Sequence, residues 1–273
     1  MSDRGDQTIL SVMAREQRLV FGEVADVYDR ARPDYPDSVV DDVAAFACLG
    51  DDSRILEVGC GTGKATVPFG ARGFTVVALE PSSEMAAVAR RNCAPFPKTE
   101  VVVSSFEDWS GDGGAFDAVV CATAWHWVQP GIRLEKAHAA LAASGALALF
   151  WHRPDWPDTP LRRAIDTVYR DVAPTLHARL PGMSPQDVGR RQCVEELEAS
   201  RLFGPVEHSR HAWHREYSRD EYLELLDTQS NHRLLEPGAR ERLFDGIGRA
   251  IDDAGGTVPV EYSVELHLAR RVG

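Results

Sequence analysis

Three glycines and two carboxylates of this sequence could together hold a ligand against the main chain. Gly59, Gly61 and Gly63 follow one another at Gly-x-Gly-x-Gly spacing, Glu57 precedes them, and Glu80 ends the next apolar run. Glycine adopts backbone angles that other residues avoid, and it lets a ligand approach the main chain closely. A carboxylate accepts hydrogen bonds from sugar hydroxyls and repels a phosphate. The stretch therefore predicts a site for a nucleoside without phosphates.

Two common glycine-rich motifs do not fit this spacing. The dinucleotide fingerprint G-x-G-x-x-G seats a pyrophosphate at a helix N-terminus, but Lys64 occupies the position of its third glycine. A phosphate-binding P-loop ends in Gly-Lys-Ser/Thr, and here Ala65 follows Gly63 and Lys64. The spacing therefore disfavours dinucleotides and nucleoside triphosphates as ligands.

The segment as a whole predicts a βαβ unit, because an apolar run, a glycine turn, a helix start and a second apolar run follow one another. It resembles the nucleoside-binding segment of class I S-adenosylmethionine-dependent methyltransferases. The resemblance implies S-adenosylmethionine as the cofactor and methyl transfer to a small molecule as the activity. No metal site is expected, because the cysteines lack the close pairing of a zinc site. The cofactor-binding residues that it implies are Tyr28, Arg32, Glu57, Gly59, Gly61, Gly63, Glu80, Pro81, Met85, Ser105, Phe106, Ala122 and Trp125.

Two further segments support the same resemblance. Residues 28–36 contain an Arg-Pro-x-Tyr-Pro turn, which is similar to a segment that folds over the cofactor in small-molecule enzymes like trans-aconitate methyltransferase. Ser105 and Phe106 follow the third predicted strand, where members of the family read the adenine edge with one side chain and a neighbouring amide. Ser105 stands where that side chain is usually acidic or an amide.

The second informative stretch is Trp125-His126-Trp127, directly after the fourth predicted strand. Open parallel sheets bind ligands beyond the carboxyl ends of their strands. The tryptophans could offer ring faces to a sulfonium cation or an aromatic substrate. His126 and His152 are the candidate catalytic bases, since neutral imidazole titrates near pH 7. A carboxylic acid acceptor would need no base and would favour an arginine clamp, from Arg32 or Arg153.

These side chains must be positioned by alternating strands and helices. The pattern predicts an α/β fold: a doubly wound, Rossmann-like, seven-stranded sheet with an antiparallel last strand, plus a helical lid. The strict alternation of residues 258–268 is typical of an antiparallel edge strand. We expect a single catalytic domain over 1–273. Its nucleoside-binding core spans about 37–153 with 202–213 and 257–272, and its lid comprises 15–36, 155–192 and 218–254.

The individual elements follow from the periodicity of the apolar residues. Strands are predicted at 54–58, 75–79, 100–103, 116–121, 146–151, 205–213 and 258–268. Helices are predicted at 17–28, 36–48, 64–71, 132–142, 161–170, 194–200, 218–231 and 238–254.

The composition limits the classes of partner that the chain can bind. The chain has 273 residues and a formal net charge of −12, which opposes binding to phosphate-rich nucleic acid or to an anionic membrane. Five cysteines without close pairing indicate reduced thiols, and the sequence has no signal core or spanning segment. The prediction is a cytoplasmic protein that acts on small molecules, while its oligomeric state stays open.

Two other functions remain compatible with the sequence. One is a protein that binds S-adenosylmethionine without methylating, as a cyclase scaffold or a sensor. The other is a dinucleotide oxidoreductase, which Lys64 opposes. A nucleic-acid methyltransferase is disfavoured, because no Asn-Pro-Pro-Tyr or Asp-Pro-Pro-Tyr follows the fourth strand.

Overall fold

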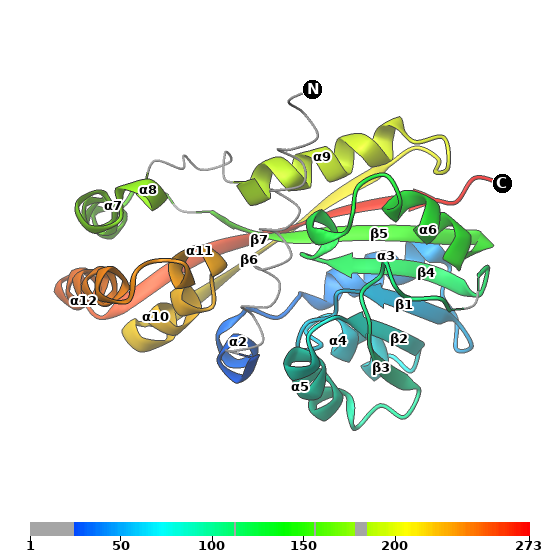
Figure 1. Ribbon diagram of the computed structural model, residues 1–273, viewed down its shortest axis with the longest axis horizontal. Coiled ribbons are helices and arrows are strands. Elements are labelled where there is room, and N and C mark those ends of the chain that lie inside the picture. Colours follow the sequence, from blue (N-terminus) through cyan, green and yellow to red (C-terminus); the bar gives the residue numbers. More distant parts are fainter. Residues whose placement is uncertain (1–24, 112, 156, 178–184) are drawn as a thin grey trace.

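The structure is a computed structural model that describes residues 25–111, 113–155, 157–177 and 185–273 (Figure 1). The predicted helix 17–28 and the predicted lid segment 15–36 therefore fall partly outside the described residues. Within them, the first helix is α2, Ala25–Ala31.

The described strands form one seven-stranded sheet in the order β3-β2-β1-β4-β5-β7-β6. Strands β1 to β5 pair in parallel, and β7 is antiparallel to both β5 and β6. The predicted doubly wound, Rossmann-like sheet with one antiparallel strand is thereby confirmed. The strands are β1 Arg54–Val58, β2 Thr75–Glu80, β3 Thr99–Val103, β4 Phe116–Ala122, β5 Leu141–Asp155, β6 Glu207–Ser218 and β7 Thr257–Arg270.

The prediction that the last strand lies at an edge is wrong. Strand β7 lies inside the sheet, where Leu266 pairs with Phe150 of β5 and with Ser209 of β6, so β6 forms the edge. The polar alternate positions of β7 reflect its second face, on which Glu265 pairs with Arg190 at 3.2 Å. Alternation arises when one face of a strand is apolar and the other meets polar groups, and it does not show whether both neighbours are present.

Helices cover both faces of the sheet. The helices α3, α4 and α5 pack on one face around the fully buried Phe69 and Val43. The helices α6 and α9 and the short turn η2 pack on the other, where Leu134, Cys193 and Trp125 are buried. The helices involved are α3 Asp37–Ala47, α4 Thr66–Ala71, α5 Ser83–Cys93, η2 Trp125–Trp127, α6 Arg133–Ala140 and α9 Pro185–Ala199.

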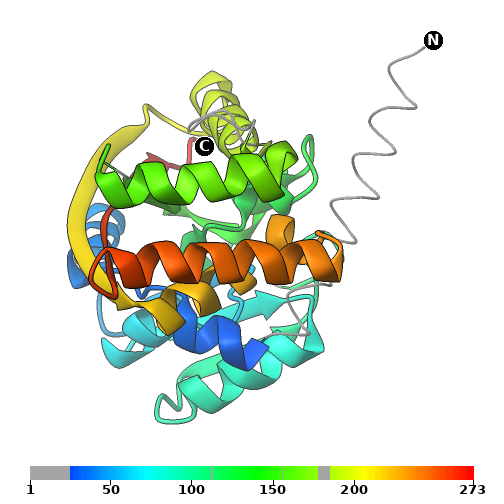
Figure 2. The ribbon, with the colours of Figure 1, turned by 90° about the vertical axis from the view of Figure 1, so that its left-hand side faces the viewer.

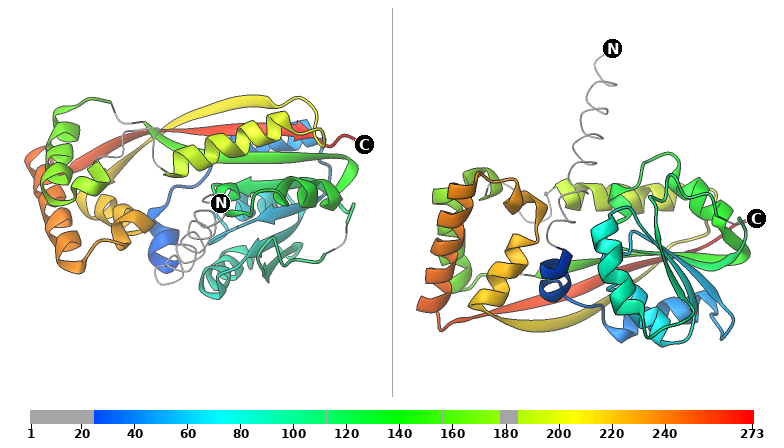
Figure 3. Two further views of the ribbon diagram at one scale, coloured as in Figure 1. Left: turned by 45° about the horizontal axis from the view of Figure 1, so that its top comes forward. Right: turned by 60° about the horizontal axis from the view of Figure 1, so that its bottom comes forward.

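Strands β5, β6 and β7 run on past the core and carry a second group of helices at their far end (Figure 1). In the end-on view, α7 and α12 lie side by side across these strands (Figure 2). This group has its own apolar cluster, which includes Ile165, Tyr217 and Leu243. We call this part the extension; its helices are α7 Pro160–Val172, α8 Pro174–His177, α10 Arg219–Asp227, α11 Ser230–Arg233 and α12 Pro237–Asp253. Figure 3 shows the extension and the core at opposite ends from two further sides.

Several predicted boundaries differ from the observed ones. Strand β6 continues to Ser218, where the hydroxyl and Glu221 form a capping box that starts α10. The predicted helix 218–231 is divided into α10 and α11, and the predicted helix 194–200 is only the end of α9. Because α9 packs on the sheet, the end of the predicted lid segment 155–192 belongs to the core layer. No helix in the described ranges is long and apolar enough to cross a membrane.

Candidate functional site

The glycine turn leaves the carboxyl end of β1 with its glycines in left-handed conformations. The φ angles are 71° at Gly59, 58° at Gly61 and 89° at Gly63. A Cβ on Gly59 would lie 2.6 Å from the Cβ of Ala124, so the turn and the chain after β4 touch at a position that only glycine permits. Gly59 and Gly61 line a cavity, as predicted for a ligand site.

Gly63 allows close packing and does not contact the cavity. A Cβ there would lie 3.5 Å from Cys93 Sγ and 3.6 Å from Ala89, both on α5. Gly63 is not among the cavity-lining residues. It allows the turn and α5 to pack closely, which positions the ligand-facing glycines indirectly.

Glu80 ends β2 with its carboxylate fixed by the main chain. Its Oε2 accepts a hydrogen bond from Gly61 N and its Oε1 accepts one from Ser82 N, both at 2.9 Å. The residue is only 8% exposed, and it lines the cavity. Two N–H donors hold the carboxylate in place without neutralising its charge, and a carboxylate is the kind of acceptor that suits sugar hydroxyls.

Glu57 lies beneath the turn and away from the cavity. It is fully buried, and its Oε2 accepts a hydrogen bond from Thr66 Oγ1 at 2.7 Å. Burial raises the pKa of Glu57 to about 7, against the hydrogen bond from Thr66, which lowers it. The sequence placed Glu57 among the cofactor-binding residues, whereas the structure places its side chain as a brace between β1 and α4.

The cavity has a volume of about 360 Å³ and lies beyond the carboxyl ends of β1, β2, β4 and β5. One end, which we call the turn end, includes Gly61, Glu80 and the chain after β3. The other, the extension end, reaches α10, α11 and β7. Of the predicted cofactor-binding residues, those that line the cavity are Tyr28, Arg32, Gly59, Gly61, Glu80, Pro81, Met85, Ser105, Phe106 and Ala122.

The side chains of Met85 and Phe106 are more than 95% buried and offer apolar surface to the turn end. Ser105 is engaged locally: its hydroxyl donates to Asp108 Oδ2 at 2.7 Å and accepts from Asp108 N at 3.0 Å. Ser105 therefore caps the tight turn after β3. The same residue also lines the cavity.

The two tryptophans of the second motif differ in whether they line the cavity. Trp125 is fully buried, and its ring lies 5.9 Å from that of Phe106 in the core beneath η2. Trp125 does not line the cavity, whereas Trp127 does. The prediction of Trp125 as a cofactor contact thus differs from its observed place, because residues two apart on a 3-10 turn point to different sides.

The chain between β4 and η2 is strained. Thr123 has a φ of 58°, which is rare for a β-branched residue. Its hydroxyl lies 2.8 Å from the hydroxyl of Tyr35, whose ring stacks on His152 with centroids 4.2 Å apart. Strain of this kind persists where the surroundings enforce it. Here the hydroxyl contact with Tyr35 joins the end of β4 to the wall of the cavity.

The two candidate bases both line the cavity. Burial lowers the pKa of His152 to about 3, with the nearby charge of Arg32 as a second cause. His126 accepts a hydrogen bond at Nδ1 from Trp151 Nε1 at 3.4 Å, which places the proton of a neutral ring on Nε2. His152 is therefore a weak base, and a neutral His126 carries its proton on Nε2.

The low pKa of His152 predicts a loss of stability in acid. The unfolded state takes up a proton below about pH 6.5, whereas the folded state does so only near pH 3. The unfolded state thus binds more protons in between, and the free energy of unfolding falls as the pH drops. Between pH 7 and pH 5 we expect the wild type to lose about 2 kcal/mol more than His152→Phe, measured by urea unfolding. His214→Phe, at an exposed site, is the control; an equal loss in His152→Phe and the wild type would contradict the prediction.

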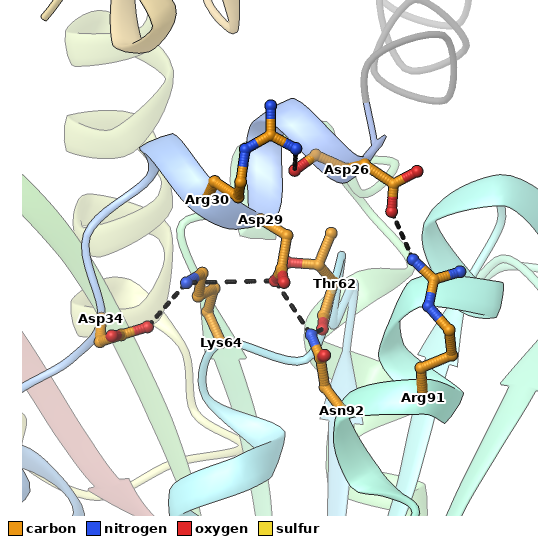
Figure 4. A network of polar contacts seen from close by, with 8 residues as sticks. All are labelled: Asp26, Asp29, Arg30, Asp34, Thr62, Lys64, Arg91 and Asn92. Carbon is orange, nitrogen blue, oxygen red and sulfur yellow. Dashed lines mark hydrogen bonds and ion pairs between the residues drawn. The ribbon is translucent and has the colours of Figure 1, made fainter. Parts of the chain in front are cut away.

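Helix α2 is fastened across the glycine turn by a polar network (Figure 4). Asn92 of α5 donates to Asp29 Oδ1 at 3.0 Å and to the carbonyl of Thr62 at 2.9 Å. Lys64 Nζ lies 4.0 Å from Asp29 Oδ1 and 2.8 Å from Asp34 Oδ1. Because Tyr28 and Arg32 of the same segment line the cavity, the network holds α2 over the site.

Arg153, the second predicted clamp, lies elsewhere. Its Nη1 is 3.3 Å from Asp187 Oδ1 and its Nε is 4.0 Å from Glu265 Oε1. It does not line the cavity. The interpretation of Arg153 as a clamp for an acceptor is therefore not supported.

The structure adds lining residues that sequence reasoning missed or left unassigned. They come from the linker after α2, from the extension and from β7: Tyr35, Tyr222, Leu225, Gln229, Ser230 and Tyr262. Only Tyr35 stood in a segment with a recognisable motif. The others carry no local signal, because their place at the cavity depends on how the extension folds back toward the glycine turn.

Comparisons with known proteins agree with this geometry. Residues 55–145 match a family model described as a methyltransferase domain. An uncharacterized methyltransferase of Mycobacterium tuberculosis is 36% identical over 141 residues, which cover 52% of this chain and 55% of that protein. The chain thus spans about half the length of the curated relatives it matches.

Two solved structures share the fold. One, described as a type II methyltransferase candidate from Anaeromyxobacter dehalogenans, has a TM-score of 0.63 at 20% identity, covering 88% of this chain and 97% of the other. The other is a phosphoethanolamine N-methyltransferase of Haemonchus contortus bound to S-adenosylhomocysteine, with a TM-score of 0.52 at 12% identity, covering 92% and 58%. At these identities the likeness shows the fold alone.

Proposed function

We propose that this chain, whose residues 55–145 match the methyltransferase-domain family and whose sheet is that of the class I enzymes, transfers a methyl group from S-adenosylmethionine to a small-molecule acceptor. The observation that carries the proposal is the carboxylate of Glu80. It is fixed by Gly61 N and Ser82 N at the cavity, with the glycine turn beside it. The trans-aconitate-like subtype stays a prediction.

The residues at the turn end fit a nucleoside that carries no phosphate. Glu80 and Glu107 both line this end, and two carboxylates would repel a diphosphate. Met85 and Phe106 supply apolar surface for a base, while the oxygens of Glu80 suit a pair of ribose hydroxyls. Gly59 and Gly61 leave room beside the main chain. We assign Ala122, at the end of β4, to the amino-acid part of the same cofactor.

When bound, S-adenosylmethionine supplies a methyl group on a positively charged sulfur, a reaction that needs no protein nucleophile. The chain contributes position and the exclusion of water, which account for much of the acceleration in such reactions. Helix α2 covers the cavity, and Trp127 offers an aromatic face to a cation. Burial makes His152 a poor base, and Nδ1 of His126 already accepts a hydrogen bond from Trp151, so we infer that the acceptor reaches the site with its nucleophilic atom already free of its proton.

The network around Asp29 predicts a faster loss of the cofactor when it is cut. Asp29→Ala removes the acceptor of Asn92 and one partner of Lys64, so α2 opens more readily. We expect S-adenosylhomocysteine to dissociate about fivefold faster, equivalent to about 1 kcal/mol for such a partly exposed contact. Stopped-flow displacement measures the rate. Asp52→Ala, an exposed carboxylate before β1, is the matched control, and an unchanged rate in Asp29→Ala would argue against a closing role for α2.

The function is tested by titrating the purified chain with S-adenosylhomocysteine and, separately, with NAD in a calorimeter. Binding of the first and not the second is expected. Production of S-adenosylhomocysteine from S-adenosylmethionine, in the presence of a panel of small acids, phenols and amines, then reports methyl transfer. Tight binding without turnover across the panel would favour the non-methylating alternative, and tight binding of NAD would overturn the proposal.

A further inference from the structure

Arg32 places a fixed positive charge at the extension end of the cavity. Its Nε donates to Thr228 Oγ1 at 2.8 Å and its Nη2 donates to the Thr228 carbonyl at 3.1 Å. The hydroxyl of Thr228 in turn donates to the carbonyl of Leu225 at 2.6 Å. The guanidinium is thus oriented by neutral groups at the end of α10, and its remaining N–H groups are available to a ligand.

Within the part of the chain that the structure describes, no carboxylate forms an ion pair with Arg32; Asp34, whose charge also acts on His152, is paired with Lys64 at 2.8 Å. The neighbouring Arg30 is paired with Glu224. The titratable groups that sense the charge of Arg32 are His152, His232, Tyr217 and Tyr262. Burial and Arg32 lower the pKa of both histidines, so these rings are neutral at pH 7. Among the described residues, the guanidinium of Arg32 at this end of the cavity therefore has no carboxylate partner of its own.

The walls at the same end are flat and aromatic. Tyr35 stacks on His152, and the ring of Tyr262 lies 6.0 Å from that of His152 in an edge-on arrangement. Tyr28 lies under the guanidinium, with the ring centroid 5.1 Å from Arg32 Cζ. Such walls suit a planar molecule. They could also attract a cation, but repulsion between two full charges in a cavity exceeds the attraction of a ring face.

We propose that the acceptor is a small planar carboxylate, which pairs with Arg32 at the extension end, and that Thr228 is the positioning residue that aims the guanidinium. The assignment of this molecule as the methyl acceptor rests on the proposed function, whereas its binding does not. The bidentate geometry of a guanidinium and a carboxylate gives both the charge match and the orientation. Ser230 and Gln229, which line the same end, complete a polar rim around the anion.

The test compares matched ligands on one protein. The purified chain is first titrated with S-adenosylhomocysteine, and the saturated protein is then titrated with benzoate, benzamide and benzylamine, and with cinnamate and cinnamamide. We expect each acid to bind at least tenfold more tightly than its amide, and benzylamine to bind most weakly. Arg32→Gln should abolish the preference for the acid, and Arg32→Lys should keep part of it. Arg30→Gln, two residues earlier in α2, should leave it unchanged.

Thr228 is tested by the same ratio. Thr228→Val, which lacks the hydroxyl that accepts from Arg32 Nε, should reduce the preference of acid over amide severalfold, and Thr228→Ser should restore it. A purely structural role would weaken both ligands equally and leave the ratio unchanged, which would refute the positioning role.

The remaining outcomes separate the two proposals. Failure of S-adenosylhomocysteine to bind would refute the proposed function, and the acid and amide would then be compared on the unliganded chain. Amide or amine binding as tight as acid binding, or no measurable acid binding at millimolar concentration, would overturn the carboxylate proposal. A preference for the acid over the amide that survives in Arg32→Gln would also overturn it. If Arg32→Gln lost affinity only for S-adenosylhomocysteine, Arg32 would be assigned to the cofactor instead.

Discussion

Replacing Glu80 by alanine is expected to weaken the binding of S-adenosylmethionine by about 1.5–3 kcal/mol, the range for hydrogen bonds to a charged group. This corresponds to about a ten- to hundredfold rise in the dissociation constant. The structure adds a second cause to the loss of contacts with the ribose. Glu80 also accepts hydrogen bonds from Gly61 N and Ser82 N, so the alanine variant leaves two main-chain donors without their acceptor and loosens the turn.

Two further variants check this assignment when affinities are measured by calorimetry. Glu80→Gln keeps the size of the side chain but turns an amide N–H toward one of the main-chain donors, and we expect it to lose nearly as much affinity as Glu80→Ala. Glu100→Ala removes an exposed carboxylate from β3, the neighbouring strand, and should bind normally. Wild-type affinity in Glu80→Ala would exclude the assignment of this residue to the cofactor.

Gly59→Ala is expected to lower the free energy of unfolding by about 2–5 kcal/mol and to abolish measurable cofactor binding. The backbone at Gly59 has a φ of 71°, which costs an L-residue energy. The new Cβ would also lie 2.6 Å from the Cβ of Ala124, so the chain after β4 must move. Because Ala122, Thr123 and Ala124 line the cavity, that movement changes the site itself.

The matched control for Gly59→Ala is Gly73→Ala. Gly73 has a φ of 85°, and a Cβ there would meet no atom within 4 Å. This variant therefore carries the backbone strain without the steric overlap, and it should lose stability by about 1–2 kcal/mol while binding the cofactor normally. Equal stability losses in the two variants, measured by urea unfolding, would show that the contact with Ala124 does not matter.

The positions at which prediction and structure differ have a common physical origin. The polar face of β7 predicted an edge strand, but that face meets Arg190, and β5 and β6 flank the strand on both sides. A strand's own sequence does not show how many neighbours it has. Of the two tryptophans, Trp125 was the one predicted as a cofactor contact, and only the packing of η2 against Phe106 decided that Trp125 is buried. Glu57 and Glu80 were likewise both predicted at the ligand, and the depth of each in the sheet separated them.

What the sequence determined by itself was local. The glycine turn, the end of β2 at Glu80 and the order of strands and helices follow from spacing, backbone freedom and apolar periodicity, all of which act over a few residues. Tertiary structure alone decided the extension end of the cavity. Arg32 and Thr228 are far apart in the chain and meet there at 2.8 Å, with Tyr262 and Ser230 beside the same cavity. Their meeting depends on how long strands and packed helices bring remote segments together, and no local preference encodes that distance.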